Sequence, residues 1–208
     1  MVNNLNKTDY KVLGVGHPRT GTGYTSKLLE SFGLSIGHER LKDDGIVAWQ
    51  MTMPLDKFGN KLPWVHPSMD YSKLNFDVII YNTRNPKNSI PSIVFTETTS
   101  LVHRSKFIDF SEAQNDIEKA IISIVGFDKQ IKNQYPKHIQ YRVEDGQKKV
   151  YDFLSEKYEL KSDYILPSSN YNSRKSRIGT INYEIVRPKY QDMINRFCIE
   201  YGYDKLFK

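Results

Sequence analysis

The stretch YKVLGVGHPRTGTGYTSKLL, residues 10–29, decides the fold predicted for this chain. It begins with an apolar run that contains Val12, Leu13 and Val15 and has the length of a buried strand. A loop rich in Gly and Thr follows, and residues 24–32 have the apolar spacing of a helix. The first N–H groups of a helix lack partners within it, and the helix dipole adds positive charge at the same end. A strand, a tight loop and a helix N-terminus therefore predict a binding site for an anion.

The loop differs from the phosphate-binding loop of nucleoside triphosphatases, G-x-x-x-x-G-K-[ST]. Gly16 and Gly21 have the required spacing, but Thr22 and Gly23 stand where that motif needs Lys and then Ser or Thr. The cation of the loop is Arg19 instead. Because both the phosphate lysine and the metal-binding hydroxyl are missing, the loop favours a donor with fewer phosphates than a nucleoside triphosphate.

A second segment, YNTRNPKNSIPS at residues 81–92, follows the unbroken apolar run of residues 76–81. Such a run is typical of an internal strand in a parallel sheet, and ligands bind at the carboxyl ends of those strands. Arg84 comes just past the strand, and Ser92 follows eight residues later in a helix that Pro86 opens. A guanidinium fork with a nearby hydroxyl suits a phosphate group. The alternative is an arginine that merely ends a strand and a serine on a helix surface.

The two segments together resemble the donor-binding motifs of sulfotransferases. PRTGTGY resembles the 5′-phosphosulfate loop, P-[KR]-[ST]-G-[ST], and RNPKNSIPS resembles the 3′-phosphate segment, R-N-P-K-[DN]-x-x-x-S. The resemblance implies that the donor is 3′-phosphoadenosine 5′-phosphosulfate (PAPS), with no metal, and that the arginine and serine of the second segment hold the 3′-phosphate. The donor-binding residues that it implies are Pro18, Arg19, Thr20, Gly21, Thr22, Gly23, Tyr24, Arg84 and Ser92.

Two later segments resemble the same family more loosely. YNSRKSRIG, residues 171–179, resembles the segment that brings an Arg-Lys pair to the 3′-phosphate, which would add Arg174 and Lys175 to the donor site. A solvated basic loop is the alternative interpretation of that segment. Residues 141–154 resemble the Y-E-D-L region of the family with its order altered, and we interpret them as structural.

Sulfuryl transfer needs positive charge at the bridging oxygen of the leaving phosphate and a base for the acceptor hydroxyl. We assign the first role to Arg19, as an electrostatic stabiliser, because a guanidinium does not readily give up a proton. Glu39 is the first choice for the base and His38 the second. Further candidates are His66 and His103 for the base, and Trp49, Trp64 and Tyr71 for rings that line an acceptor site unless they belong to the core.

Composition limits the partners. A net charge of +6 and a pI of about 9.2 favour an anionic partner, such as a nucleotide or an acidic glycan. The basic residues are dispersed along the chain, so a nucleic-acid groove is the weaker interpretation. The single cysteine, Cys198, excludes an internal disulfide and fits a reducing compartment. No transmembrane run or apolar signal region is found, so we expect a cytoplasmic protein without a membrane segment. No Cys or His group has the spacing of a metal site.

The rest of the chain alternates helices and strands. The further predicted elements are a helix at residues 44–51, a surface loop at 54–70, a long helix with a capping box at Ser111 and Gln114, a strand at 138–143, a helix at 147–156 and a last helix from Pro188 to about Tyr201. This alternation predicts a P-loop-like three-layer α/β/α fold with a central parallel sheet. The length fits one sulfotransferase-like domain over residues 1–208.

The predicted function is that of a sulfotransferase, which moves a sulfuryl group from PAPS to a hydroxyl of a carbohydrate or small metabolite. Two alternatives stay open. A P-loop kinase of small molecules would depend on ATP and magnesium, although the loop lacks the residues that such an enzyme needs. A catalytically inactive nucleotide- or anion-binding module would bind the nucleotide without turnover.

Overall fold

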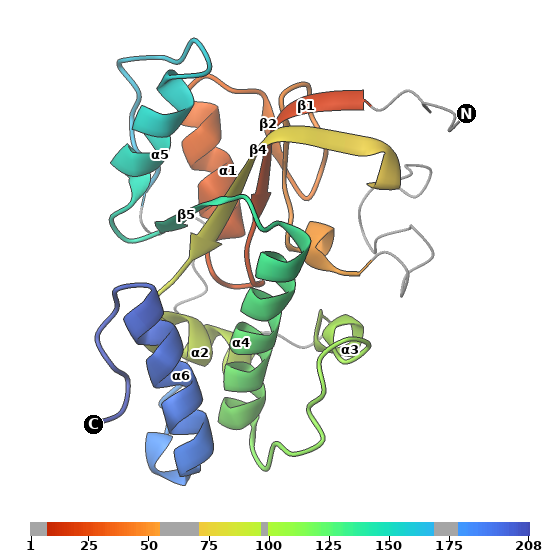
Figure 1. The fold of residues 1–208 in the computed structure, drawn as a ribbon. Coiled ribbons are helices and arrows are strands. Elements are labelled where there is room, and N and C mark those ends of the chain that lie inside the picture. The colour runs from red at the N-terminus through yellow and green to blue at the C-terminus, as the bar shows by residue number, and fades with distance from the viewer. Residues whose placement is uncertain (1–7, 55–70, 97–99, 169–178) are drawn as a thin grey trace.

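The computed structural model describes residues 8–54, 71–96, 100–168 and 179–208. At its centre lies a five-stranded sheet in the order β2-β3-β1-β4-β5, in which every pairing is parallel (Figure 1). The strands are β1 (Thr8–Val15), β2 (Ile36–His38), β3 (Gly45–Val47), β4 (Leu74–Thr83) and β5 (Ile139–Arg142). Because β1 and β4 are parallel neighbours, the loops that follow them emerge at the same edge of the sheet.

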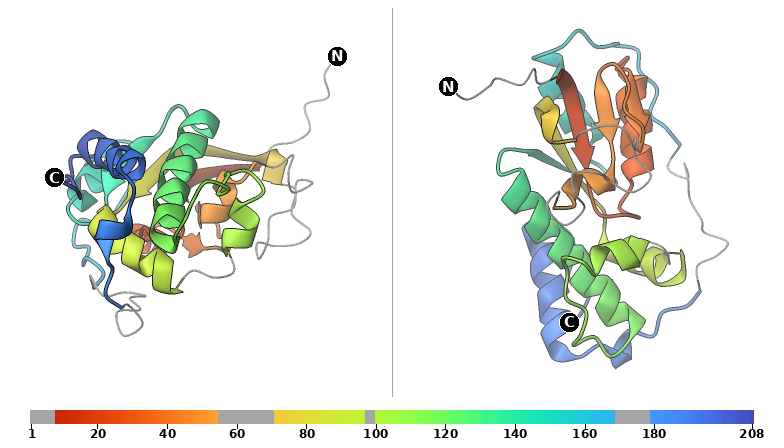
Figure 2. Two further views of the ribbon diagram at one scale, coloured as in Figure 1. Left: turned by 90° about the horizontal axis from the view of Figure 1, so that it is seen from below. Right: turned by 90° about the vertical axis from the view of Figure 1, so that its right-hand side faces the viewer.

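Helices cover both faces of the sheet (Figure 2). They are α1 (Thr22–Ser31), α2 (Pro86–Thr96), α3 (Ser100–Arg104), α4 (Asp116–Gln134), α5 (Gln147–Ser155) and α6 (Pro188–Glu200), with the 3₁₀ helices η1 (Trp49–Thr52), η3 (Tyr71–Lys73) and η5 (Tyr183–Ile185). One core cluster joins α1 and α5 to the sheet, and the other contains residues of η1, α2, α4 and α6. The predicted three-layer α/β/α class with a central parallel sheet is confirmed.

Strand β1 shows why the first apolar run has no polar alternation. Val12 belongs to the cluster under α1 and α5, whereas Leu13 and Val15 belong to the cluster under α4. Successive side chains of a strand point to opposite faces, and both faces are covered here, so all three residues are fully buried. The same reason accounts for the apolar run within β4, where Val78 and Ile80 face one cluster and Tyr81 faces the other.

The predicted helix at residues 44–51 is wrong. Residues Gly45–Val47 form strand β3, which pairs with β1 and β2, and only the short η1 follows. Gly45 has a φ of 141°, and a Cβ at this position would lie 1.9 Å from the carbonyl oxygen of Val12. Only glycine allows that close approach of two backbones. A strand of three residues has too short a pattern to be told from a helix by periodicity, so pairing with its neighbours decides its conformation.

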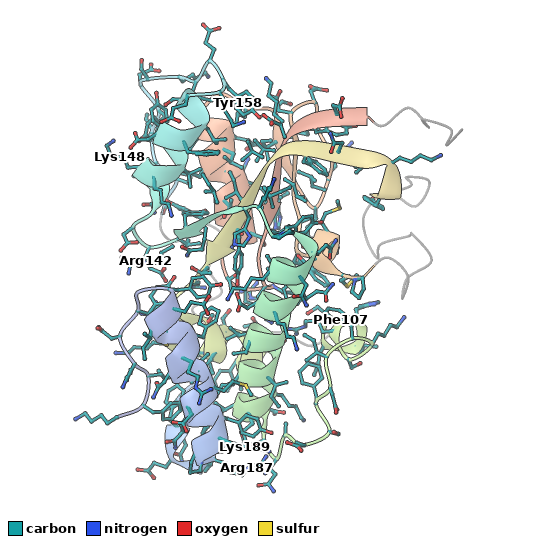
Figure 3. The ribbon with its side chains drawn as sticks, in the orientation of Figure 1. Phe107, Arg142, Lys148, Tyr158, Arg187 and Lys189 are labelled. Atoms are coloured by element: carbon teal, nitrogen blue, oxygen red, sulfur yellow. The ribbon has the colours of Figure 1, made fainter. Side chains whose placement is uncertain are left out.

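The start of the long helix also differs from the prediction. The N-cap of α4 is Asn115, whose side chain accepts a hydrogen bond from the N–H of Glu118 at 2.9 Å, so the predicted capping box at Ser111 and Gln114 is wrong. The Glu118 carboxylate in turn accepts from the Gln114 N–H at 2.8 Å and from Arg187 Nη2 at 2.8 Å. Arg187 lies at the N-terminal end of α6 (Figure 3), so this ion pair ties the starts of α4 and α6 together.

Other predicted elements agree with the structure. Pro86 opens α2, and the last helix runs from Pro188 to Glu200, one residue short of the predicted end. Helix α1 begins at Thr22, two residues before the predicted start, so the last residues of the anion loop already belong to its first turn. The helix at 147–156 is observed as α5 and the strand at 138–143 as β5. The short helix α3 was not predicted.

Candidate active site

The candidate site is built around the loop between β1 and α1. Thr20 closes this loop, because its N–H and its Oγ1 both donate to the carbonyl of His17, at 3.0 and 2.6 Å. Asn82, the second-last residue of β4, donates from Nδ2 to the carbonyl of Thr20 at 3.0 Å. A Cβ on Gly16 would lie 2.5 Å from that same Nδ2. The glycine therefore leaves room for a side chain of the neighbouring strand to hold the loop.

Helix α1 starts where the loop ends. Its N-cap is Gly21, with a φ of 99° and no side-chain cap, and Thr22, Gly23 and Tyr24 follow in the first turn. The N–H groups of a first turn have no acceptor within their own helix, and the dipole adds positive charge there. This end of α1 thus has the backbone geometry of an anion site. Thr25 stabilises this first turn, because its Oγ1 donates to the Gly21 carbonyl at 3.0 Å.

The second predicted segment lies against this loop. Arg19 donates from Nε to the Oγ of Ser92, on α2, at 3.0 Å, and Arg84 donates from Nη1 to the carbonyl of Arg19 at 3.2 Å. Ser92 is buried, and both arginines are half-buried. The two segments are far apart in the sequence, and the pairing of β1 with β4 brings them together.

The charge of Arg84 is held in a partly desolvated place. Burial lowers the pKa of Arg84, and the nearby Glu144 and Tyr203 act in the opposite direction. Glu144 also accepts hydrogen bonds from the N–H of Asn85 at 2.9 Å and from the Tyr203 hydroxyl at 3.2 Å. A guanidinium that has lost part of its hydration gains more from an anionic ligand than one in open water does.

The two candidates for the base, His38 as the last residue of β2 and Glu39 as the next one, lie at the same edge of the sheet. His38 Nε2 lies 3.3 Å from the Oγ1 of Thr22, in the first turn of α1. The N–H of Glu39 donates to the carbonyl of Val47 at 2.9 Å, which holds the residue beside the end of β3. Surrounding protein atoms lower the pKa of His38 below its ordinary value, and the Glu39 carboxylate partly offsets this. His38 is therefore neutral at pH 7, the form that can accept a proton.

Backbone strain marks two of the predicted site residues. Within the described ranges, the non-glycine residues with positive φ are Arg19, at 75°, and Glu39, at 55°. This left-handed conformation costs a residue with a side chain on the order of 1–3 kcal/mol, and it persists only where the surrounding structure imposes it. Such residues concentrate at ligand sites and active sites, so both angles favour a functional role for this edge of the sheet.

Not all predicted residues gather here. Trp49 and Tyr71 are buried in the core cluster that also contains α4, so of the two interpretations of these rings the structure shows the core one. His103 lies on α3, and burial and Lys106 lower its pKa. His66, Trp64, Arg174 and Lys175 lie outside the described residues. Pro18 is buried in the loop itself.

Sequence reasoning missed Asn82, which bonds the loop, and Glu144, which lies beside Arg84. Asn82 is a fully buried polar residue directly after an apolar run, and that position was a usable signal. Glu144 belongs to a segment interpreted as structural, and only the pairing of β5 with β4 brings it to the site.

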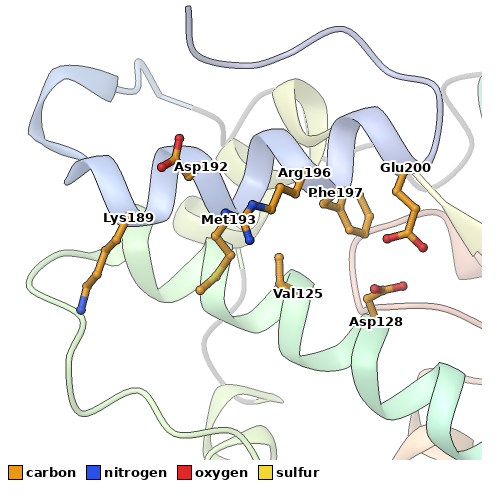
Figure 4. Close-up of a pocket in the computed structure, with 8 residues that line it drawn as sticks. All are labelled: Val125, Asp128, Lys189, Asp192, Met193, Arg196, Phe197 and Glu200. Carbon is orange, nitrogen blue, oxygen red and sulfur yellow. The ribbon is translucent and has the colours of Figure 1, made fainter.

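A separate hollow of about 400 Å³ lies between α4 and α6 (Figure 4). Its lining residues are Val125, Asp128, Lys189, Asp192, Met193, Arg196, Phe197 and Glu200. Asp128 accepts from Lys132 at 2.9 Å and from the buried hydroxyl of Tyr81 at 2.9 Å. The bond from Tyr81 joins α4 to the sheet, and no predicted site residue lines the hollow.

In the part of the chain that the structure describes, no three His, Cys, Asp or Glu residues form a group that could hold a metal ion. Over the same ranges, no helix has both the length and the apolar character needed to cross a membrane.

Comparisons with known proteins add little to this geometry. No family model matches the chain, and no curated protein matches its sequence. Among solved structures, the mouse sulfotransferase SULT7A1 complexed with PAP is similar, with a TM-score of 0.40 and 12% identity, over 92% of this chain and 84% of that chain. At that level of similarity, the function of the site has to be argued from its own residues.

Proposed function

We propose that this chain is a sulfotransferase, which transfers a sulfuryl group from PAPS to a hydroxyl of a carbohydrate or small metabolite. The observation that carries the proposal is the contact between the two phosphate motifs. Arg19, from the loop after β1, donates to Ser92, and Arg84 donates to the carbonyl of Arg19. A ligand with one phosphate at each end of a nucleoside would have both motifs within reach.

The donor would bind through its two phosphate groups. The 5′-phosphosulfate would lie at the N-terminus of α1, where the N–H groups of Gly21 to Tyr24 and the helix dipole favour an anion. Arg84 and Ser92 would hold the 3′-phosphate, since a guanidinium fork and a hydroxyl supply complementary donors. The site needs no metal for this arrangement, because arginine supplies the positive charge.

The chemical step is the attack of the acceptor oxygen on sulfur. A bond forms between the acceptor oxygen and sulfur, and the bond from sulfur to the bridging phosphate oxygen breaks, which releases adenosine 3′,5′-bisphosphate. Arg19 would stabilise the negative charge that develops on that oxygen. Glu39 would take the proton of the acceptor hydroxyl. Its enforced left-handed backbone supports this choice over His38.

One experiment separates this function from its rivals. Purified protein is titrated with adenosine 3′,5′-bisphosphate, AMP and ATP by calorimetry, with and without magnesium, and labelled PAPS is then offered with sugars and phenols. A sulfotransferase binds the bisphosphate best, does so without magnesium, and transfers label. Preference for ATP with magnesium would support the kinase, and tight binding of bisphosphate without any transfer would support the inactive binding module.

A further inference from the structure

A buried polar cluster lies directly behind the anion loop, and the function proposed above makes no use of it. We call it the His17 network. It consists of His17 in the loop, Arg104 at the end of α3 and Ser123 in the middle of α4. His17 is 3% exposed, and the other two side chains are fully buried. Burying three polar side chains from three separate elements has a large desolvation cost. The hydrogen bonds among them offset this cost, and their position behind the loop suggests a role in holding it.

The contacts assign the ring nitrogens of His17. Ser123 Oγ lies 2.7 Å from Nε2, and Arg104 Nη1 contacts both Nε2 and Ser123 Oγ. An arginine N–H can only donate, so Nε2 must be the acceptor nitrogen of the ring. Nδ1 then carries the proton, and it faces the carbonyl of Pro18. Burial and the charge of Arg104 both lower the pKa of His17 well below its usual value, which agrees with a neutral ring.

The bond to the Pro18 carbonyl is placed where the loop is strained. That carbonyl belongs to the peptide unit that leads into Arg19, the residue with a φ of 75°. The same Arg19 offers its carbonyl to Arg84 and its Nε to Ser92. The peptide that His17 holds therefore precedes the residue on which both phosphate motifs converge.

From this geometry we infer that His17 is a positioning residue, which keeps the loop in its anion-binding conformation by donating from Nδ1 to the Pro18 carbonyl. Arg104 and Ser123 fix the tautomer that makes this bond possible, and so they couple α3 and α4 to the donor site. The link to catalysis rests on the proposed function, whereas the effect on loop order does not. Phe127, whose ring meets that of His17 edge-on at 5.3 Å, keeps the imidazole from turning.

Two amide variants test the inference. In His17→Asn, the side-chain amide can donate from near the place of Nδ1, so the bond to Pro18 is kept. In His17→Gln, the amide reaches the place of Nε2 and meets Arg104 and Ser123, but the bond to Pro18 is lost. His138→Asn is the matched control, because His138 Nδ1 also lies against a carbonyl, that of Tyr135 at 2.7 Å, in a half-buried place outside the network.

Two readouts are measured on each full-length variant. The first is amide hydrogen exchange of Thr20 and Thr25, whose N–H groups bond to the carbonyls of His17 and Gly21. The second is the Kd for adenosine 3′,5′-bisphosphate. For His17→Gln we expect exchange at least tenfold faster at both amides and a Kd at least tenfold weaker. For His17→Asn and His138→Asn we expect both values within threefold of the wild type.

The inference is overturned if His17→Asn and His17→Gln are equally impaired, because the network would then be ordinary packing. It is also overturned if neither variant changes exchange at Thr20. If the wild type binds no bisphosphate but exchange still separates the two variants as expected, the proposed function fails and the positioning role stands.

Discussion

Arg19 Nε donates a hydrogen bond to Ser92 Oγ at 3.0 Å, across 73 residues of sequence. The guanidinium thus lies between the N-terminus of α1 and the face of α2 that carries Ser92. In the proposed complex, Arg19 would contact the 5′-phosphosulfate, and Ser92, which it touches, would contact the 3′-phosphate. This contact also means that binding of the donor has to share or replace a bond that already exists within the protein.

The first prediction concerns ligand choice. Adenosine 3′,5′-bisphosphate is expected to raise the Tm without magnesium, by more than AMP does, because AMP leaves Arg84 and Ser92 without an anion. At one hundred times its Kd, a ligand adds about 2.7 kcal/mol to the free energy of unfolding. Thermal scans with each nucleotide at equal concentration measure this. Equal shifts from AMP and the bisphosphate would mean that no 3′-phosphate site exists.

The second prediction concerns Arg84. Arg84→Ala is expected to weaken bisphosphate binding by about 2–5 kcal/mol, the usual cost of removing one partner of a desolvated charge pair. Ser92→Ala is expected to cost about 1 kcal/mol, since one hydrogen bond is lost. Lys148→Ala is the control, because it removes the same charge from an exposed side chain of α5 that pairs with Asp152 (Figure 3). Calorimetry on all three variants decides the matter, and undiminished affinity in Arg84→Ala would place the 3′-phosphate elsewhere.

The third prediction separates an enzyme from a binding module. Glu39→Gln keeps size and polarity but cannot take the proton of the acceptor, so the rate of transfer should fall by about 10²–10⁴. Donor affinity should hardly change, because the base faces the acceptor. The assay follows labelled sulfate, with a donor titration beside it. A wild-type rate in Glu39→Gln would move the same test to His38, and then to His66 and His103.

The fourth prediction uses the backbone of Glu39. Glycine adopts a φ of 55° without the strain that a side chain brings, so Glu39→Gly should leave the free energy of unfolding within about 1 kcal/mol of the wild type while it abolishes transfer. Urea unfolding and the transfer assay on the same preparation measure both. A loss of several kcal/mol would show that the Glu39 side chain stabilises the fold rather than serving the reaction.

The fifth prediction concerns pH and the ion pair between Glu118 and Arg187. The hydrogen bonds from Arg187 are the main cause that lowers the pKa of Glu118 from 4.5 to about 2. A lowered pKa stabilises the folded state above the unfolded pKa, and this contribution disappears as the pH falls from about 4.5 to 2. Glu118→Gln should therefore cost about 3 kcal/mol at pH 7, with the deficit shrinking toward pH 2.

A matched control for this pair is Glu112→Gln. Glu112 pairs with Lys189 near the same end of α6, but its side chain is 73% exposed. Screening by water makes such a pair nearly neutral for stability. A constant deficit of Glu118→Gln across the acidic range would mean that packing, and not charge, accounts for its contribution.

The sequence by itself determined the layered architecture and the place of the candidate site. The apolar runs around Val12 and Val78 lack polar alternation because helices cover both faces of an internal parallel strand. This pattern does not depend on which part of the chain supplies those helices. The carboxyl ends of parallel strands share one edge, so Arg19 and Arg84 could be predicted to approach each other from their positions after two strands alone.

Only the tertiary structure decided the features that depend on a distant partner. Gly45 lies in a strand because its backbone pairs closely with Val12 of β1. The sequence of residues 44–51 alone has no pattern that predicts this pairing. Trp49 and Tyr71 lie in the core cluster that α4 also joins, although rings near a ligand site look the same in sequence. The His17 network joins residues up to 106 positions apart. Which hydrogen-bond partner a buried polar group finds depends on the packing of distant segments, and the sequence around that group does not reveal it. Local pattern sets most of the elements, and contacts with distant parts of the chain decide how they meet.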